Sequence, residues 1–482
     1  MSNSIDVESG VESPSTRIIQ VFDPSTEEQI AEVVDSDQKA VDAAVARARE
    51  TFESGVWRKQ PAIHRADVLF RAAAIVRERT DELAAIEARD NGMNAMAARH
   101  IIAVAYDMLM YYAGWVGKIH GESSSLVSDG LLGEFESFHT FTQLEPVGVV
   151  GLIVPWNGPF FVAMLKVAPA LAAGCSAVLK PAEETPLSAL KLEEIFREAG
   201  LPDGVLTVVT GYGETTGAAL TAHPDVDKIS FTGSTEVGRL IVKAAAGNLK
   251  RLTLELGGKS PLIMFDDADL DKAIMGAGMG LLAGSGQNCS CTSRIYVQRG
   301  IYDRVVDGLA AFAKMLPMGG SDDPTSVLGP LISAKQRERV EGIVDDGVAA
   351  GAHVVTGGRP MDRRGYFYEA TIITGTTPDM RLIREEIFGP VGSVIPFDDE
   401  DEVIAAANDT DYGLAGSIWT ENLGRAHRVV NELRAGQIWV NSALAADPSM
   451  PICGQKQSGW GGERGRKGID AYFNTKAVYI RI

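Results

Sequence analysis

The sequence predicts an α/β protein with a doubly wound parallel sheet, a second α/β unit and a small β element. Between residues 149 and 255, short apolar runs alternate with amphipathic segments of about 10–15 residues, which is typical of βαβ units. A second alternation of this kind begins near Pro261. The apolar, alternating tail 476–482 is expected to pair with the extended segment 135–144, within or between subunits, because a lone terminal strand is unstable; this pairing indicates the small β element.

Three helices are expected first, because apolar positions recur there at spacings of three and four. They span residues 38–53, 65–89 and 97–119. In the first α/β unit we expect strands at 149–154, 177–179, 205–209, 228–231 and 252–255. The helices between them are expected at 161–173, 187–199, in a short segment that ends at Leu220, and at 236–246. The second unit is predicted to contain strands 295–297 and 438–441 and helices 302–315 and 334–350.

The length of 482 residues exceeds one hydrophobic core and predicts two or three domains. With 45 basic and 64 acidic residues, the net charge of −19 argues against nucleic acids and anionic membranes as partners. No apolar run approaches the ~20 residues of a membrane helix, and the polar, acidic start differs from a signal peptide. Four cysteines are too few for a disulfide scaffold, and Cys289 and Cys291 lack a second ligand pair, so no metal is predicted. We expect a cytoplasmic protein whose first ~15 residues are disordered.

Three polar side chains stand where catalytic groups are often placed. Cys289 lies in a loop of small residues, where a thiolate can attack a carbonyl carbon; the alternative is a small buried apolar residue. Glu255 ends a predicted strand before two glycines and is either a general base or a solvated carboxylate. Asn157 follows another strand and either donates to an oxyanion or caps the next helix.

Two glycine-containing loops are candidates for phosphate binding. The segment 211–217 matches a dinucleotide fingerprint weakly, because no acidic residue follows about 20 positions later at a strand end. The segment 231–238 is better placed, since it follows a strand and opens a helix whose N–H groups can meet a pyrophosphate. Lys180 and Glu183 follow a further strand and suit the hydroxyls of a ribose, with a surface ion pair as the alternative.

Five segments, taken in order, closely resemble the NAD(P)-dependent, non-acylating aldehyde dehydrogenase superfamily. The resemblance extends from about Val21 to the end of the chain. The segments that carry it are residues 255–259 (ELGGK), 286–289 (GQNC), 155–157 (PWN), 385–390 (EEIFGP) and 457–465, which begins QSG and ends ERG.

The resemblance implies the chemical roles. Cys289 is expected to attack the aldehyde and form a thiohemiacetal, with the Asn157 side chain and the Cys289 N–H as the oxyanion hole. After hydride transfer, Glu255 is expected to activate the water that hydrolyses the thioester. Lys166 and Glu463 match positions that assist proton relay in relatives. The resemblance and the placement of the glycines together give an expected cofactor set: Ile153, Trp156, Lys180, Glu183, Gly213, Gly233, Ser234, Gly238, Leu256, Glu386 and Phe388.

The Glu183 carboxylate is expected to accept a hydrogen bond from the ribose 2′-hydroxyl and to repel a 2′-phosphate, which predicts NAD rather than NADP. Several positions where aromatic residues are frequent in small-aldehyde relatives carry smaller or aliphatic residues here. The expected pocket comprises Gly158, Phe161, Leu165, Ser290, Ala446 and Ile452. A wide aliphatic pocket predicts a bulky apolar aldehyde, whether long-chain, terpenoid or aryl. The alternative is that Phe160, Phe161 and Met450 refill the space.

The resemblance also implies the domain organisation. We expect an NAD-binding domain of residues 1–124 and 147–256, a catalytic domain of 257–458, and a bridging element of 125–146 and 459–482 that builds homodimers or homotetramers. Two other functions stay open, a coenzyme-A-acylating aldehyde dehydrogenase and a non-catalytic NAD-binding relative. Glu255 argues against the first, because transfer to coenzyme A needs no hydrolytic base.

Overall fold

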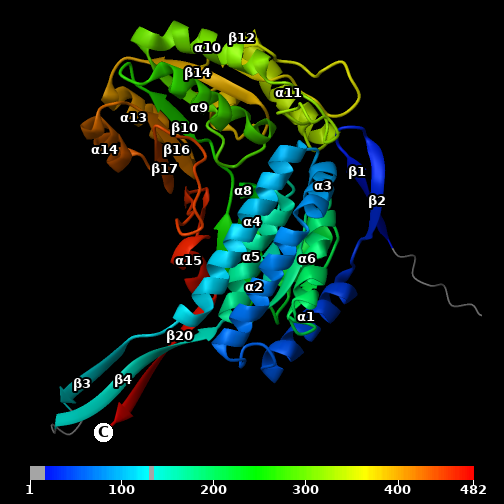
Figure 1. The fold of residues 1–482 in the computed structure, drawn as a ribbon. Coiled ribbons are helices and arrows are strands. Elements are labelled where there is room, and N and C mark those ends of the chain that lie inside the picture. Colours follow the sequence, from blue (N-terminus) through cyan, green and yellow to red (C-terminus); the bar gives the residue numbers. More distant parts are fainter. Residues whose placement is uncertain (1–16, 130–134) are drawn as a thin grey trace, which may run out of the picture.

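The protein is described here from a computed structural model, which covers residues 17–129 and 135–482. The amino-terminal segment that the sequence predicts to be disordered lies outside this range. The chain forms two large, mainly parallel sheets, each with its own helices, and a small antiparallel sheet that projects from the body and carries the C-terminus (Figure 1).

The amino-terminal part contains a hairpin and four helices. The hairpin, which the sequence analysis missed, pairs β1 (Ile18–Asp23) with β2 (Glu28–Val34). The helices are α1 (Gln38–Ser54), α2 (Ala62–Glu78), α3 (Thr80–Asn91) and α4 (Ala95–Trp115). The single helix predicted over 65–89 is therefore wrong. The helix breaks at Arg79, whose backbone leaves helical geometry (φ −94°, ψ 19°) and whose guanidinium pairs with Glu194 and Glu198 of α6.

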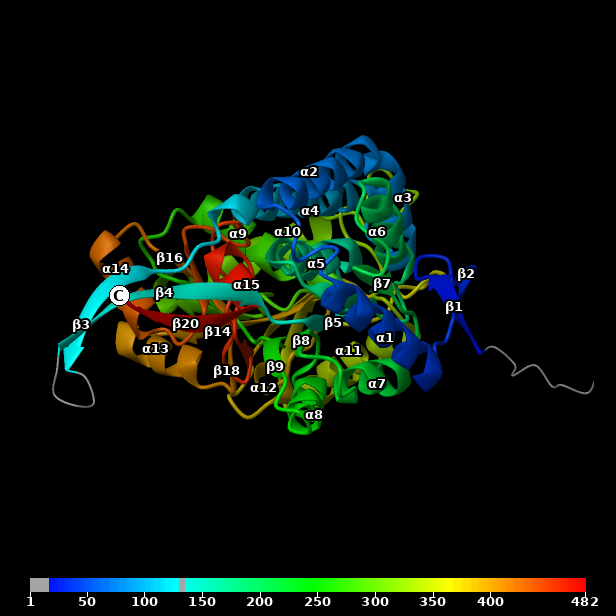
Figure 2. The ribbon, with the colours of Figure 1, turned by 90° about the horizontal axis from the view of Figure 1, so that it is seen from below.

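The first large sheet has the strand order β19-β9-β8-β5-β6-β7, parallel except for β19. Its strands are β5 (Val149–Ile153), β6 (Ser176–Lys180), β7 (Leu206–Val208), β8 (Lys228–Thr232), β9 (Arg251–Glu255) and β19 (Gly459–Trp460). The connecting helices are α5 (Pro159–Ala173), α6 (Leu187–Glu198), α7 (Ala218–Ala222) and α8 (Thr235–Ala245). Helices cover both faces, with α2, α4, α5 and α6 on one and α1, α7 and α8 on the other (Figure 2). This doubly wound arrangement confirms the predicted fold class.

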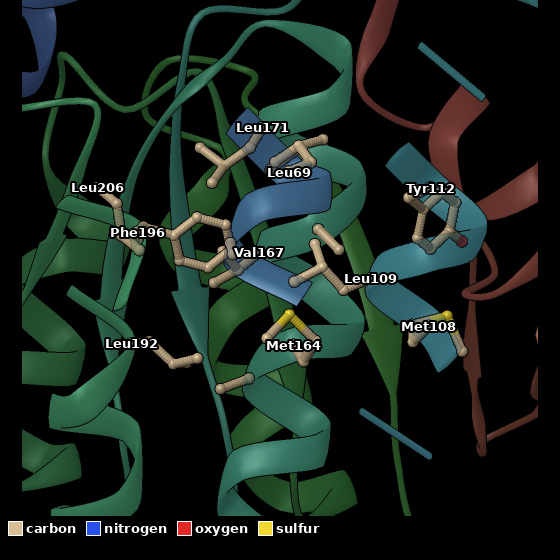
Figure 3. Close-up of a cluster of buried hydrophobic side chains, with 14 of the residues drawn as sticks. Leu69, Met108, Leu109, Tyr112, Met164, Val167, Leu171, Leu192, Phe196 and Leu206 are labelled. Atoms are coloured by element: carbon tan, nitrogen blue, oxygen red, sulfur yellow. The ribbon is translucent and has the colours of Figure 1, made fainter. Parts of the chain in front are cut away.

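Helix α5 forms the centre of the larger core. Nearly all of its residues are buried, as expected of a helix that is apolar all round. Figure 3 shows Met164, Val167 and Leu171 of this helix between Leu109 of α4 and Phe196 of α6. Because α5 is held on every side, residues at its amino-terminal end are fixed relative to the strand ends beside them.

The second large sheet has the order β12-β13-β14-β11-β10-β16-β17, parallel except for β12. Its strands are β10 (Pro261–Met264), β11 (Arg294–Gln298), β12 (His353–Thr356), β13 (Thr371–Thr374), β14 (Val391–Phe397), β16 (Ala415–Trp419) and β17 (Gln437–Val440). Its helices are α9 (Leu270–Leu282), α10 (Tyr302–Met315), α11 (Ala334–Ala349), α12 (Arg381–Arg384), α13 (Glu400–Asn408) and α14 (Leu423–Glu432). A short antiparallel ribbon pairs β15 (Tyr412–Gly413), which precedes β16, with β18 (Gln455–Lys456), which comes after β17.

The projecting sheet joins β3 (Ser123–Asp129), β4 (Phe135–Pro146) and β20 (Phe473–Arg481), which follows the short helix α15 (Gly465–Asp470). Strand β20 pairs antiparallel with β4, from Phe473 opposite Pro146 to Arg481 opposite Phe138. The predicted pairing of the tail with the segment 135–144 is therefore confirmed, within one chain. Among the described residues, no helix is long and apolar enough to cross a membrane.

Candidate active site

The predicted polar residues gather where the first sheet faces the second. Asn157, Lys180 and Glu255 follow or end strands β5, β6 and β9, and the carboxyl ends of parallel strands meet at one edge of a sheet. The Cys289 loop approaches this edge from the second sheet. A cavity of about 380 Å³ joins Asn157, Glu255 and Cys289. The structure therefore brings the three candidate catalytic groups to one site.

The Cys289 loop is held by tight backbone turns and by hydrogen bonds to a neighbouring segment. After α9, residues 284–286 all have positive φ (61°, 56° and 70°), which is uncommon for the non-glycine Ser285. The Ser285 hydroxyl donates a hydrogen bond to Gly329 O (2.8 Å). The side-chain amide of Gln287 accepts a hydrogen bond from Ile332 N (2.9 Å) and donates one to Pro330 O (3.2 Å). Anchored in this way, the loop presents a half-buried Cys289 to the cavity.

The electrostatic surroundings of Cys289 favour the neutral thiol. Burial, together with the carboxyls of Glu386 and Glu255, raises the pKa of Cys289 to about 12, against a smaller opposing effect of Ser290. The thiolate is the reactive form of cysteine. Attack on a carbonyl therefore needs a base that removes the proton, or a positive charge brought close to the sulfur.

The Asn157 side chain is positioned by the same loop. Its Nδ2 donates to Gln287 O at 2.9 Å, two residues before Cys289. A primary amide has two N–H groups, so one remains after this contact. The arrangement leaves a donor in the cavity that Asn157 and Cys289 line together, and such a donor can stabilise an oxyanion.

Glu255 is buried, and neither of its carboxylate oxygens has a hydrogen-bond partner among the described residues. Burial, and then the charge of Glu463, raise the pKa of Glu255 well above its usual range. Glu463 itself forms an ion pair with Lys166, which is completely buried. The Ser230 hydroxyl lies between them: it accepts a hydrogen bond from Lys166 Nζ (3.1 Å) and donates one to Glu463 (3.2 Å). Ser230 was missed by the sequence analysis, because only the tertiary fold brings it next to Lys166 and Glu463.

Most of the expected cofactor residues follow strands of the first sheet, whereas Glu386 and Phe388 lie between α12 and β14 of the second unit. Lys180 Nζ lies 3.1 Å from a Glu183 oxygen, so an ammonium and a carboxylate stand side by side at the end of β6. Ser234 caps α8 by accepting from Val237 N (3.2 Å), and Gly233 precedes it. Glu386 accepts from Gly258 N (3.1 Å), and burial raises the pKa of Glu386 to about 7.

The remaining residues of the expected cofactor set are held mainly by packing against their neighbours. The rings of Trp156 and Phe388 meet edge to face with centroids 5.1 Å apart. Ile153 is buried at the end of β5, Gly238 packs against the side chain of Leu256, and Gly213 begins the turn that leads into α7. Leu256 also lines the cavity.

All six expected pocket residues line the cavity. These are Gly158, Phe161, Leu165, Ser290, Ala446 and Ile452. Of the aromatic and methionine side chains expected as alternatives, Phe161 alone lines it. Phe160 is fully buried elsewhere in the core, and Met450 is 62% exposed.

One wall of the cavity and one charged residue in it were not predicted from the sequence. Helix α4 contributes Ala97, His100, Ile101 and Val104, which share one face at spacings of three and four. Arg464, next to Glu463, also lines the cavity. The helical spacing was visible in the sequence, but which of two apolar faces meets the site depends on long-range packing.

This fold and site are those of an enzyme class that places a cysteine thiol and a buried carboxyl at the ligand-binding edge of a doubly wound sheet. The aldehyde dehydrogenase family model matches residues 11–478. Aldehyde dehydrogenase 1 of Tanacetum cinerariifolium is 43% identical over 470 residues, covering 97% of this chain and 93% of the relative. Retinal dehydrogenase 2 of Homo sapiens is 42% identical over 473 residues, covering 98% and 90%.

A solved structure agrees with these sequence matches. The NAD⁺ complex of aldehyde dehydrogenase from Bacillus cereus is 42% identical and matches with a TM-score of 0.94, covering 97% of this chain and 94% of that one. The chain belongs to the aldehyde dehydrogenase family, which confirms the resemblance inferred from its motifs.

Proposed function

We propose that this enzyme oxidises a bulky, apolar aldehyde to the carboxylic acid with reduction of NAD. The observation that carries the proposal is the single cavity that joins Cys289, Asn157 and Glu255 to a predominantly aliphatic and aromatic wall. Its volume of about 380 Å³ lies in the range of about 300–1,000 Å³ that small-molecule sites occupy.

The proposed chemistry uses each polar group once. Cys289 releases its thiol proton to solvent and adds through Sγ to the aldehyde carbon, and the free N–H of Asn157 together with the Cys289 N–H stabilise the oxyanion. NAD, held by the residues at the sheet edge, would supply the acceptor for the hydride that leaves this carbon, and Cys289 would then carry the thioester. Glu255 then removes a proton from water, which attacks the thioester and releases the acid. Glu463, whose charge acts on Glu255, and its partner Lys166 then pass that proton away from Glu255; the support is their buried ion pair.

The residues at the sheet edge fit NAD. The ammonium of Lys180 and the carboxylate of Glu183 provide a donor and an acceptor for neighbouring ribose hydroxyls. The start of α8 at Ser234 offers backbone N–H groups to a pyrophosphate. A carboxylate at Glu183 also repels a 2′-phosphate, which supports NAD over NADP.

The substrate class rests on small or aliphatic residues around the thiol. Gly158 adds no side chain, and a Cβ there would meet only Val162 at 3.9 Å. Leu165 and Ile452 are aliphatic, and Ala446 is small. A chain or ring that fills this space gains roughly 25 cal/mol for each Å² of apolar surface removed from water, which favours bulky over short aldehydes.

The test is NADH formation with NAD and aldehydes from acetaldehyde to decanal, citral and benzaldehyde, beside Cys289→Ala. We expect kcat/KM to rise with substrate bulk and activity to vanish in the variant. Equal kcat/KM for acetaldehyde and octanal would contradict the bulky-substrate proposal. Product formation that depends on coenzyme A would favour an acylating enzyme, and NAD binding without turnover of any aldehyde would favour a non-catalytic relative.

We further propose that the domains of the chain divide at residues 124/125, 146/147, 256/257 and 458/459. We also propose that the chain forms homodimers or homotetramers through the projecting sheet. The support is the exposed outer edge of β20, which carries Tyr479 and Ile480 at 65% and 48% exposure. An open strand edge with apolar side chains is normally covered.

A further inference from the structure

Arg464 places a guanidinium in the wall of the catalytic cavity. Its side chain lies over the ring of Phe161, 5.3 Å from the ring centroid, and both residues line the cavity with Cys289 and Glu255. Arg464 is only 8% exposed. The residue is therefore enclosed with the reacting groups and turned away from bulk solvent.

The guanidinium of Arg464 has no polar partner within residues 17–129 and 135–482. Its Nε is buried without a hydrogen bond, and the group forms no ion pair with a described carboxylate. Arginine keeps its charge at all ordinary pH values and carries five N–H donors. A buried charge with unused donors is costly unless a ligand supplies the acceptors.

The neighbouring acidic groups compensate this charge only in part: burial lowers the pKa of Arg464, and the charge of Glu463 opposes that shift without a hydrogen bond to the guanidinium. Glu463 is already held by Lys166 and Ser230. Glu255 faces Arg464, but burial raises its pKa well above the usual range, which favours the neutral carboxyl. The other titratable groups that face the guanidinium are Cys289 and Tyr112, and burial keeps both of them neutral as well.

The backbone fixes the direction of the side chain. Arg464 has φ 58°, in the left-handed region, where a non-glycine residue persists only when its surroundings enforce it. Glu463, directly before it, exchanges two backbone hydrogen bonds with Ile452 (2.8 and 2.9 Å), and Arg464 O receives Gly468 N (2.9 Å). The backbone thus fixes the direction in which the side chain leaves the chain, and the contact with the Phe161 ring holds the guanidinium at the cavity.

We propose that Arg464 binds a carboxylate on the substrate, so that the preferred aldehydes are ω-oxo acids with an apolar body. This deepens the proposed function and rests on it: the apolar wall receives the body while the planar fork of Arg464 receives two carboxylate oxygens. The aldehyde end still meets Cys289. Arg464 is a specificity-determining residue that takes no part in bond making.

The experiment compares matched substrate pairs with NAD, octanal against 8-oxooctanoate and benzaldehyde against 4-formylbenzoate. The wild-type enzyme is expected to prefer the carboxylate in each pair. Arg464→Met should lower the ratio of kcat/KM for the carboxylate to that for its uncharged partner by about 10- to 100-fold in each pair, as for loss of a charged hydrogen bond. Arg464→Lys should retain part of the preference. The control Arg466→Met removes an exposed arginine (63% exposed) of α15, the helix that begins directly after Arg464, and should change nothing.

A second measurement needs neither NAD nor turnover. The rate of Cys289 alkylation by iodoacetate, divided by that by iodoacetamide, reports on a cation in the cavity, and Arg464→Met should lower this ratio about tenfold or more. An unchanged ratio, or a wild type that oxidises both members of each pair equally, would overturn the role of Arg464. If no aldehyde is oxidised at all, the proposed function fails, while the alkylation ratio still decides whether Arg464 attracts anions.

Discussion

A methyl group on Gly258 would overlap the carbonyl oxygen of Cys289. The backbone of the candidate nucleophile therefore lies directly on this glycine. The preceding Gly257 has the same relationship with the carboxylate of Glu386. The paired glycines after Glu255 thus let the thiol loop and a cofactor-side carboxylate approach the end of β9.

Gly258→Ala should therefore displace the Cys289 loop. A misplacement of about 1 Å at a reacting group costs roughly 10²-fold in rate, and we expect a loss of that order in kcat/KM. Steady-state kinetics and a thermal melt measure the variant. Gly342→Ala is the control, because a Cβ at this position in α11 meets nothing within 4 Å. Activity of Gly258→Ala within twofold of wild type would show that the loop has room to shift.

Glu255→Gln should separate the two halves of the reaction. Hydride transfer needs no base at this position, whereas loss of a general base slows hydrolysis by about 10²–10⁴-fold. Stopped-flow fluorescence should then show one equivalent of NADH formed rapidly, followed by slow turnover. Loss of the burst as well as turnover would instead indicate that Glu255 also deprotonates Cys289.

The same residue predicts opposite pH trends for activity and stability. Because burial raises the pKa of Glu255, the carboxylate that acts as base becomes available only as pH rises, and turnover should rise with it. The folded state binds this proton more tightly than the unfolded chain, so stability falls as pH rises from the ordinary glutamate pKa of 4.5 through the raised pKa of the folded state. Glu255→Gln removes this loss, and its unfolding free energy should exceed that of wild type increasingly at higher pH.

Much of the fold could be predicted because local patterns coincide with it. Strands β5 and β6 contain short apolar runs, and β8 and β9 alternate apolar with polar residues; their predicted bounds agree with the structure within one or two residues. The break at Arg79 could not be predicted, since the ion pairs that accompany it come from α6, more than 100 positions away. The hairpin β1–β2 is short and depends on packing against the rest of the chain.

The candidate site likewise contains residues that can be predicted from the sequence and residues that cannot. Residues in sequence motifs, such as Cys289 and Glu255, can be identified from the sequence alone, because their neighbours carry a recognisable pattern. Ser230, the pocket face of α4 and Arg464 cannot, because their importance depends on which distant groups they meet. No local spacing indicates that Arg464 points into a cavity shared with Cys289.

Glu183→Ser should change the cofactor preference. Removing the carboxylate removes repulsion of a 2′-phosphate and frees Lys180 Nζ, now 3.1 Å from Glu183, to pair with it. We expect the ratio of kcat/KM for NADP to that for NAD to rise roughly 10- to 100-fold. Asp203→Ser, which changes an exposed acid before β7 at the opposite edge of the sheet, is the control. An unchanged ratio would mean that Glu183 does not face the 2′-position.

The buried Lys166–Glu463 pair predicts a non-additive stability effect. Lys166→Met leaves the Glu463 carboxylate buried without its cation and should cost about 3–5 kcal/mol of unfolding free energy. The double variant Lys166→Met, Glu463→Leu removes both charges and should recover most of this loss. Urea denaturation measures both, and a double variant less stable than Lys166→Met would contradict the expectation. Neither variant is expected to turn over aldehydes at the wild-type rate.

The projecting sheet predicts the assembly state. Tyr479, Ile480 and Ile482 are 65%, 48% and 77% exposed at its edge, and no described part of the chain covers them. Because exposed apolar edge strands favour pairing with another chain, we expect wild type to elute as a dimer or tetramer. Ile480→Lys with Ile482→Lys should lower the mass measured by light scattering by at least half. Leu249→Lys, at an 87% exposed apolar residue before β9, should leave it unchanged. A monomeric wild type, or a double variant of unchanged mass, would exclude this edge as the interface.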